Sequence, residues 1–514
     1  MVKNITSGSP AAKTNLKIGD LIVAVNEKDV TSHQDLVKLM KASGLSVNLS
    51  VYRDGTHIYQ IDKKIYSSRI VSSIVLFGFD LTNLFYISFE DTPKSVIHKN
   101  MISNMCRENL TLPRENDRAR LAKSTAEFTK KLGKAALKVL GEKEYNKNKF
   151  CSPFSIQSAL GMLLLGSKNW TREQIFENVF QSFQKKNMSI HGSLLDLTNR
   201  ISESSRSGNG TFNVANRMYV QKKFNILPTF KEETESCYLA SAAKIDFKNK
   251  PEQSRVEINK WVKNKTMDKI EELLPLNSLS SDTRFVLVNA IYFYGTWKYQ
   301  FDTNKTKKAK FNVIGKKSNE TASDVEVDMM YQSGYFTVCK PDGIDAQVLQ
   351  MNYTGDRLSM VIVLPNKVDG LSGVQESMGK FHYNKCIKGK RHSKIDVSIP
   401  TFEIKSEYKM KNLLSEIGIK DLFDGKKADL SGISSKPLYV DEVYHEAYIK
   451  VNEEGTEAAA ATGAVGTLNR FPDRAQGFHC THPFVFMIVE NEMGTILFTG
   501  TVTDPSKGVD EKKD

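Results

Sequence analysis

The sequence predicts an α+β protein with one large mixed domain and a smaller segment ahead of it. Residues from about 121 to 507 alternate long helical and strand patterns, and no Pro-, Gly- or Ser-rich linker divides them. Residues 4 to about 61 form a separate compact pattern of strands and one helix. We therefore expect a small domain at 1–61, a linker of uncertain structure at 62–120, the large domain at 121–507 and a charged, solvated tail at 508–514.

The composition is that of an ordinary globular protein. The chain has 514 residues, of which 40% are hydrophobic and 25% are charged, and this excludes a collagen, a coiled coil and a wholly disordered chain. The 72 Lys and Arg residues exceed the 59 Asp and Glu residues, so the net charge is +13. Because this charge is spread along the chain, it does not indicate a nucleic-acid partner.

The motifs of common enzyme and metal sites are absent from the sequence. The six cysteines include no CxxC pair and no close Cys/His pairing, and they are too few to form a disulfide scaffold. No GxSxG, HExxH or GxxxxGK[ST] motif occurs. We expect no catalytic residues, no metal and no cofactor.

The most apolar run, residues 70–89, is a poor membrane span. Asp80 lies inside it, and a carboxylate near the middle of a bilayer costs about 2.5 to 3.5 kcal/mol. The first residues of the chain lack the apolar core of a secretory signal. We expect no membrane association.

The small domain combines a turn, an apolar strand, a helix and a second strand. Gly19-Asp20 supplies the turn, residues 32–41 read as a capped helix, and residues 47–52 as a strand that ends in an Arg-Asp-Gly turn. This segment resembles the second half of a PDZ domain, particularly the PDZ domains of HtrA-type proteases. A PDZ domain captures a carboxylate in a glycine-rich nest that would precede this segment. We expect no peptide binding here, and binding along the 32–41 helix is the alternative.

The large domain opens with a helix at 127–140 and a second, apolar helix for which Ser152 suits the N-cap and Pro153 the first turn. Further motifs follow in order: ANRMY around 217, VNAIYFYGTW ending at 297, ADLSGI around 430, HEAYIKVNEEGTEAAA from 445 and HPFVF from 482. Together they resemble the serpin family of serine protease inhibitors over residues 121–507. The resemblance implies a large mixed central β-sheet, further sheets, surrounding helices and an exposed reactive loop.

The segment after Glu453 has a pattern suited to insertion into a sheet. Read with a period of two, one face carries only small residues, namely Thr456, Ala458, Ala460, Thr462 and Ala464. A strand with such a face can enter between packed neighbours, whereas one bulky insertion costs roughly 1 to 3 kcal/mol. The resemblance makes this segment the hinge of the reactive loop, formed by Glu453, Gly455, Thr456, Ala458, Ala460 and Thr462.

The resemblance also assigns two sets of residues to the central sheet. The first is the shutter, a polar cluster that holds the middle of the sheet together: Ser152, Ser155, Asn216 and His445. The second is Trp297, at the breach, the point where the loop first inserts. From the residues alone, the shutter reads equally as a buried hydrogen-bonded cluster and Trp297 as an ordinary core aromatic.

Two stretches are dense in lysine. The first lies between 307 and 317, and the second consists of Lys385, Lys388, Lys390, Arg391, His392 and Lys394. The second run is a candidate site for a sulfated polysaccharide, and a solvated charged face is the alternative.

We expect an inhibitory serpin, monomeric, that traps a serine protease as a covalent acyl-enzyme while its cut loop inserts into the central sheet. A non-inhibitory serpin that acts as a chaperone or carrier, and a scaffold acting through the PDZ-like segment, are the alternatives. The resemblance favours an extracellular location, but the missing signal leaves a cytoplasmic one open.

Counting along the loop from Glu453 nominates the bond Asn469-Arg470 for cleavage, with an uncertainty of about one residue. Arg470-Phe471 suits a trypsin-like protease, whose buried carboxylate pairs with an arginine. We therefore expect Arg470 to be the recognised residue, with Asn469-Arg470 as the alternative bond. Leu468-Asn469 would serve a chymotrypsin-like protease.

Overall fold

The computed structural model of the chain divides into two compact units, residues 1–109 and 110–514. The structure describes the following residues: 21–25, 28–29, 46–53, 57–64, 115–141, 147–183, 189–206, 211–238, 240–313, 323–456 and 476–508.

The described part of the first unit is an antiparallel sheet with the order β2-β1-β3-β4. Its strands are β1 (Leu21–Val25), β2 (Lys28–Asp29), β3 (Ser46–Arg53) and β4 (His57–Lys64). The two strands predicted on either side of the expected helix are confirmed as β1 and β3. The predicted helix at 32–41 and the apolar run at 70–89 lie outside the described residues.

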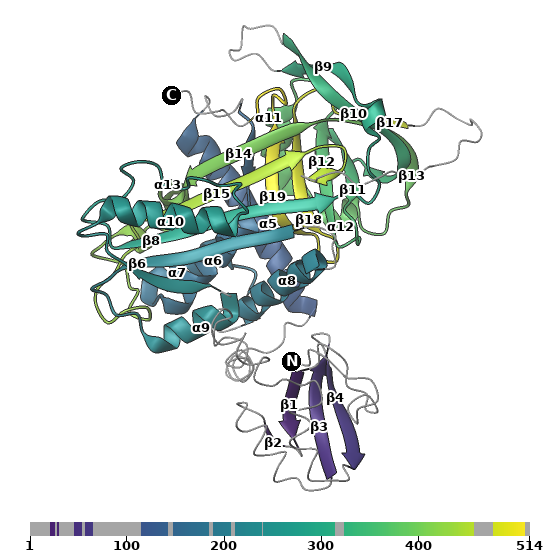
Figure 1. The fold of residues 1–514 in the computed structure, drawn as a ribbon. Helices are drawn as coiled ribbons and strands as arrows, with labels where there is room; N and C mark the ends of the chain where they lie inside the picture. Colours follow the sequence, from purple (N-terminus) through teal and green to yellow (C-terminus); the bar gives the residue numbers. More distant parts are fainter. Residues whose placement is uncertain are drawn as a thin grey trace. The chain divides into compact units, whose positions relative to one another are not determined.

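The second unit is built on a central sheet with the order β14-β15-β16-β8-β6-β7 (Figure 1). These strands are β6 (Thr211–Gln221), β7 (Ser241–Ile245), β8 (Phe285–Thr296), β14 (Phe402–Lys409), β15 (Glu442–Val451) and β16 (Gly455–Thr456). The predicted mixed central sheet is confirmed.

Strand β8 is apolar along nearly its whole length because both faces of the sheet are covered. Val288 and Ala290 pack in the cluster that contains Ile258 and Val262 of helix α10 (Pro251–Lys265). Leu287, Ile291 and Phe293 face the opposite way, into the main core. The period of two thus divides one apolar strand between two cores.

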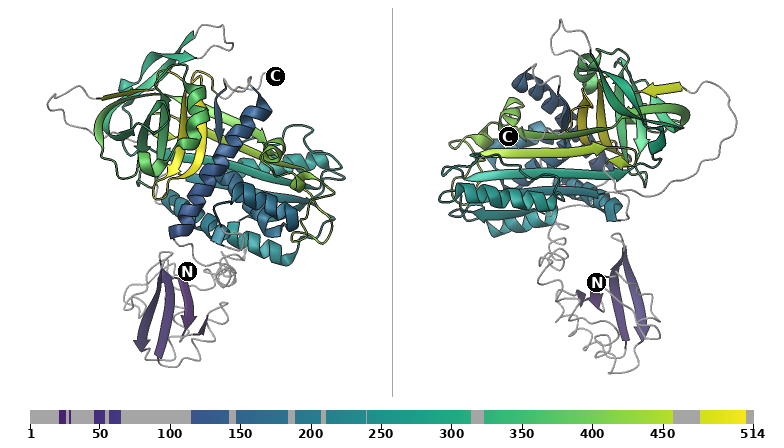
Figure 2. Two further views of the ribbon diagram at one scale, coloured as in Figure 1. Left: turned by 180° about the vertical axis from the view of Figure 1, so that it is seen from behind. Right: turned by 45° about the horizontal axis from the view of Figure 1, so that its top comes forward.

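Helices on the other side of the sheet from α10 complete the main core (Figure 2). They include α5 (Glu115–Leu140), α6 (Pro153–Gly166), α7 (Asn169–Val179), α8 (Ser189–Arg206) and α9 (Pro228–Tyr238). Helix α6 is buried all round, which explains its lack of a polar face.

The sequence pattern predicted the first helix only from Glu127, but α5 begins at Glu115. Its added turns bury Leu121 and Ala122 and carry acidic residues where the helix dipole favours them.

A second large sheet has the order β17-β13-β10-β11-β12-β18-β19-β5, with β9 paired to β10. Its strands are β5 (Lys149–Cys151), β9 (Lys307–Val313), β10 (Ser323–Cys339), β11 (Ala346–Asn352), β12 (Leu358–Pro365), β13 (Ser393–Pro400), β17 (Gln476–His479), β18 (Phe484–Glu490) and β19 (Thr495–Val502). Short helices accompany the two sheets: η3 (Thr303–Lys305), α11 (Leu371–Ser377), η4 (Met378–Lys380), α12 (Tyr383–Cys386), α13 (Met410–Glu416) and η5 (Asp421–Phe423).

One disulfide ties α12 to the end of β10. It joins Cys339 and Cys386, whose Cα atoms are 5.7 Å apart although 47 residues separate them in the chain. Spacing along the sequence gave no sign of this pair.

We predict that removing residues 1–109 leaves the second unit folded, because its hydrophobic core is built from residue 121 onward. The melting temperature of a 110–514 chain should lie within about 2 °C of the full-length value, since a 1 kcal/mol change moves it by about that much in a large domain. A start near Asp117, inside the first turn of α5, should give the same result. Thermal unfolding followed by circular dichroism is the measurement. A fall of more than about 5 °C would show that the first segment is integral to the fold.

Candidate functional site

The candidate site is the junction between the two central strands β8 and β15. These strands pair in parallel from Val286 opposite Glu442 up to Tyr292 opposite Tyr448. Above that point β16 lies between them, with Thr456 opposite both Gly295 of β8 and Val451 of β15. The sheet is therefore closed along its lower part and parted at one end by the two residues of β16.

The predicted shutter residues Ser152 and His445 contact each other beneath the closed part of the sheet. The backbone N–H of Ser152 donates to His445 Nε2 (3.1 Å), and the Ser152 hydroxyl donates to the Leu497 carbonyl (2.7 Å). Ser152 also caps α6, because its Oγ accepts from the N–H of Ser155 (3.1 Å). The helix start is thus bonded directly to strand β15.

Asn289 of β8 is the centre of the cluster. Its Nδ2 donates to Ser155 Oγ (2.5 Å) and to Asn216 Oδ1 of β6, and its Oδ1 lies 2.5 Å from His445 Nδ1. The shutter predicted from the sequence contained the other four residues of this cluster but not Asn289. The signal available was a single amide inside the otherwise apolar run FVLVNAIYF.

The hydrogen bonds fix the protonation of His445. Its Nε2 accepts from a backbone N–H, so the proton of the neutral ring is on Nδ1 and is donated to Asn289. The side chain is fully buried, and burial lowers its pKa from 6.5 to about 3. A second proton would place two donors face to face at Nε2. His445 therefore keeps its bond to the Ser152 N–H, and with it the link between α6 and β15, only in its neutral form.

Trp297 lies where β16 parts the sheet. Its backbone N–H donates to the Glu454 carbonyl (2.9 Å) and its indole N–H to the Asn452 carbonyl (3.0 Å). The indole ring stacks on Tyr353, with centroids 4.7 Å apart, and the Tyr353 hydroxyl lies 2.9 Å from Thr456 Oγ1. The two aromatic rings thus form the floor on which the inserted end of the hinge rests.

The described part of the hinge is firmly bonded. The Glu453 carbonyl accepts from the Phe301 N–H (2.9 Å), and its carboxylate accepts from the Thr306 hydroxyl (2.6 Å). Gly455 has φ +153°, and a Cβ there would lie 2.1 Å from the Gly295 carbonyl oxygen, so only glycine fits. The further hinge and cleavage residues lie outside the described residues: Ala458, Ala460, Thr462, Leu468, Asn469, Arg470 and Phe471.

No group of three or more His, Cys, Asp and Glu side chains in the described residues is arranged to hold a metal ion. None of the described helices is long and apolar enough to cross a bilayer.

Two known families match this chain, one in each of its two units. The family model of serpins, described as serine protease inhibitors, matches residues 127–505. The chain belongs to the serpin family. Residues 1–59 match the model of the PDZ domain, which agrees with the resemblance seen in the first unit.

Individual serpins are similar over the same region. Leukocyte elastase inhibitor A of Mus musculus is 38% identical over 374 residues, which cover 71% of this chain and 95% of the relative. Serpin B3 of Homo sapiens is 35% identical over 380 residues, with the same coverage of 71% and 95%. Among solved structures, uncleaved ovalbumin is 29% identical with a TM-score of 0.64, covering 75% of this chain and all of that one. Arabidopsis AtSerpin1 in its native stressed conformation is 27% identical with a TM-score of 0.66, covering 76% and 99%.

We predict that acid destabilises this serpin partly through His445. The buried ring stays neutral down to about pH 3, whereas the unfolded ring titrates near 6.5, so between these values only the unfolded state takes up the proton. The free energy of unfolding should therefore fall by about 1.4 kcal/mol per pH unit below pH 6.5 on account of this residue.

Urea unfolding of the wild type and of His445→Asn at several pH values between about 6 and 4 tests this prediction. The variant should be less stable at neutral pH but show a shallower dependence on pH. His191 is also buried with a pKa of about 3, caused by burial and then by Arg172, so part of the slope should remain. Equal slopes for the two proteins would contradict the role given to His445.

Proposed function

We propose that this chain is an inhibitory serpin that traps serine proteases by inserting its cleaved loop between β8 and β15. The observation that carries the proposal is the position of Gly455 and Thr456. These residues, which lead into the loop, already pair with both β8 and β15 at the parted end of the sheet. The remaining hinge can extend β16 in the same direction once β8 and β15 separate.

The proposed mechanism follows from this path. A protease attacks the loop and forms an acyl-enzyme, and the freed hinge then extends β16 as a strand between β8 and β15. Each hydrogen bond it gains contributes about 0.5 to 1.5 kcal/mol net. The attached protease is carried along and its oxyanion hole is distorted, where the loss of one donor alone slows deacylation by about 10² to 10³. The acyl-enzyme therefore persists.

Three groups of residues have distinct roles in this proposal. The small hinge face from Thr456 to Thr462 allows passage between packed strands. Trp297 and Tyr353 receive its first residues. The shutter, with Asn289 at its centre, must release the β8–β15 pairing and then close on the new strand, so it sets the energy needed for opening.

Arg470 is the proposed recognition residue, with Arg470-Phe471 as the cleaved bond. An arginine there suits the carboxylate pocket of a trypsin-like protease. Relatives of this chain are leukocyte elastase inhibitors. If this chain shared the target protease of these relatives, cleavage would follow a smaller or apolar residue, and Leu468 is the candidate for that residue.

We predict that Arg470→Ala abolishes inhibition of trypsin-like proteases without changing the melting temperature. The substitution removes the charge-assisted contact but lies in the loop. The measurement is incubation with a panel of serine proteases followed by denaturing electrophoresis. The wild type should form a heat- and detergent-stable adduct with a trypsin-like enzyme, and the peptide released from it should begin at Phe471. A peptide beginning at Asn469 or Arg470, or an adduct with elastase alone, would overturn the assignment.

A second prediction separates trapping from recognition. Thr456→Arg should convert the inhibitor into a substrate, because Thr456 is fully buried between two strands and arginine cannot follow the same path. Its matched control, Thr456→Ser, keeps a hydroxyl near Tyr353 and should still inhibit. Both variants are mixed with protease, and adduct is measured against cleaved product. Undiminished adduct with Thr456→Arg would contradict insertion at β16.

A carrier function is the second candidate, and a cavity favours it. The cavity of about 850 Å³ lies between α5, β18 and β19, and its walls include Leu132, Leu137 and Met487. Thyroxine-binding globulin, solved in complex with thyroxine, is 26% identical to this chain with a TM-score of 0.65. Clean cleavage by every protease of the panel, without adduct, would favour this candidate over inhibition.

A further inference from the structure

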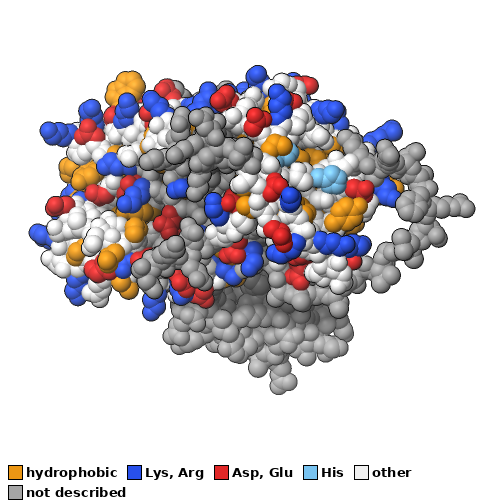
Figure 3. Space-filling model, turned by 90° about the horizontal axis from the view of Figure 1, so that it is seen from above, with side chains coloured by type: hydrophobic (Ala, Val, Ile, Leu, Met, Phe, Trp, Pro, Cys, Tyr) orange, Lys and Arg blue, Asp and Glu red, His pale blue; other side chains and the backbone are white. Residues whose placement is uncertain are grey.

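Two neighbouring carboxylates, Asp441 and Glu442, lie where β15 begins, at the end of the strand far from β16. Both side chains belong to half-buried residues, and both accept hydrogen bonds from backbone N–H groups. On the face drawn in Figure 3, by contrast, Lys and Arg are mixed with Asp and Glu at the surface. Exposed ion pairs contribute little to stability, whereas a carboxylate fixed by backbone N–H groups contributes more.

The Asp441 carboxylate reaches from the start of β15 to the start of β8. Its Oδ2 accepts from the backbone N–H groups of Arg284 and Phe285, both at 2.8 Å. The Asp441 N–H in turn donates to the Phe285 carbonyl (2.9 Å). We name these three hydrogen bonds the lower latch. It lies one position before the first parallel pair of the two strands, Val286 opposite Glu442.

The Glu442 carboxylate makes the same kind of contact but does not reach β8. Its Oε1 accepts from the N–H of Lys411 in α13 (2.8 Å) and from the N–H of Val443 in β15 itself (2.9 Å). Helix α13 directly follows β14, and β14 pairs with β15 over eight positions. Glu442 therefore joins only elements that lie on one side of the boundary between β8 and β15.

The register of β16 relates the lower latch to an inserted strand. Thr456 lies opposite Gly295 of β8 and Val451 of β15. Gly295 is ten residues from Phe285, and Val451 is likewise ten residues from Asp441. In the same register, the tenth residue added after Thr456 would therefore come level with both sides of the lower latch.

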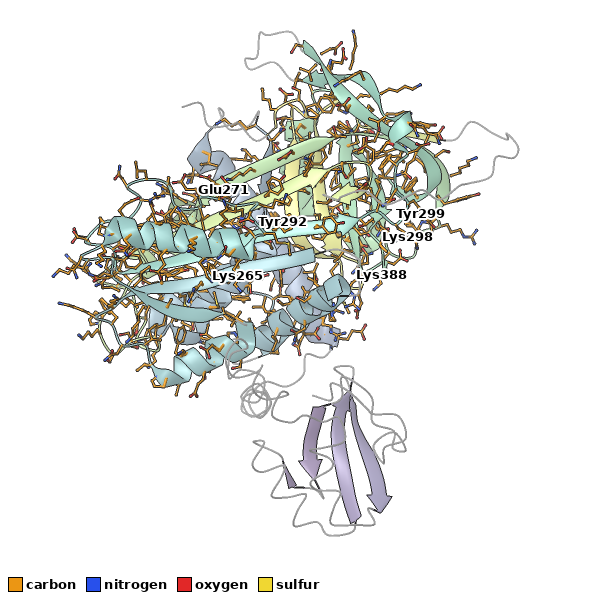
Figure 4. The ribbon with its side chains drawn as sticks, viewed as in Figure 1. Lys265, Glu271, Tyr292, Lys298, Tyr299 and Lys388 are labelled. Carbon is orange, nitrogen blue, oxygen red and sulfur yellow. A yellow bond between two sulfur atoms is a disulfide. The ribbon has the colours of Figure 1, made fainter. Side chains whose placement is uncertain are left out.

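An inserted strand meets the shutter before it meets the lower latch. Asn289 and His445 lie opposite each other and are four residues nearer to β16 than the latch is. Figure 4 shows the direction of this path, because Tyr292 lies on β8 and Lys298 lies beyond the end of β8 at which β16 pairs. Opening the shutter alone therefore admits only the first part of the strand.

We propose that Asp441 is a positioning residue for loop insertion, and that its bonds to Arg284 and Phe285 hold the far end of the sheet closed until the strand arrives there. Neighbouring strands lie about 4.8 Å apart, so a strand between β8 and β15 increases their separation to about 9.6 Å. Hydrogen bonds between Asp441 and Phe285 cannot span that distance. The lower latch thus stabilises only the closed sheet. The inference rests on the proposed mechanism of loop insertion and identifies a late step in it.

The test compares the melting temperatures of the full-length protein before and after its loop is nicked by a protease that it does not trap. Asp441→Ala removes the oxygen that accepts two of the three bonds of the latch. We expect the uncleaved variant to melt about 5 °C below uncleaved wild type, because two charge-assisted hydrogen bonds are lost. The nicked variant should melt within about 2 °C of nicked wild type, because insertion has already broken the latch.

Two variants are the controls. Glu442→Ala also removes an oxygen that accepts from two backbone N–H groups, but neither group belongs to β8. It should therefore lower the melting temperatures of the uncleaved and nicked proteins by similar amounts. Asp441→Asn keeps an amide oxygen that can accept from Arg284 and Phe285. Its uncleaved form should melt closer to wild type than Asp441→Ala does.

The outcomes separate the lower latch from loop insertion itself. If nicking raises the melting temperature of wild type but Asp441→Ala lowers both forms equally, or lowers neither, insertion stands and the latch is wrong. If nicking does not raise the melting temperature of wild type, loop insertion is overturned, and the latch with it.

The protease assay gives a further readout. Because the lower latch opposes insertion, Asp441→Ala should form at least as large a proportion of adduct to cleaved product as wild type. A smaller proportion would contradict the proposal.

Discussion

The structure depends on a buried hydrogen-bonded cluster that closes the central sheet between β8 and β15. Asn289 holds the cluster together, because its one amide bonds to Ser155, Asn216 and His445 from three other elements. Buried polar groups are costly when left unpaired. Separating β8 from β15 therefore costs the free energy of these buried hydrogen bonds. The sheet stays closed, but its strands can still separate.

The same sheet is already parted at the end where the hinge enters. Gly455 passes where no other residue fits, and Thr456 bonds to Tyr353 above the stacked ring of Trp297. In this fold β8 and β15 are thus paired in the middle of the sheet, whereas β16 already lies between them at one end. Because β8 and β15 run in parallel, a strand inserted between them can pair antiparallel with both. The backbone N–H and C=O groups of both strands would then be hydrogen-bonded again.

The sequence predicted the apolar helix capped by Ser152 and the strands β1 and β3 because each depends on local spacing. It could not predict the role of Asn289, since a single amide only interrupts the apolar pattern of the strand. Its partners Ser155 and His445 become its neighbours only in the folded protein. The Cys339–Cys386 bond was missed for the same reason, because tertiary contact alone makes these two residues neighbours. The start of α5 was missed because its first turns bury only small or isolated side chains.

The measurement that tests loop insertion most directly is the melting temperature of the protein before and after its loop is nicked by a protease that it does not trap. Insertion of a strand of about ten residues adds enough hydrogen bonds to raise the melting temperature on the order of 20 °C. The nicked wild type should show this rise, and nicked Thr456→Arg should not. An unchanged or lower melting temperature of the nicked wild type would contradict the account.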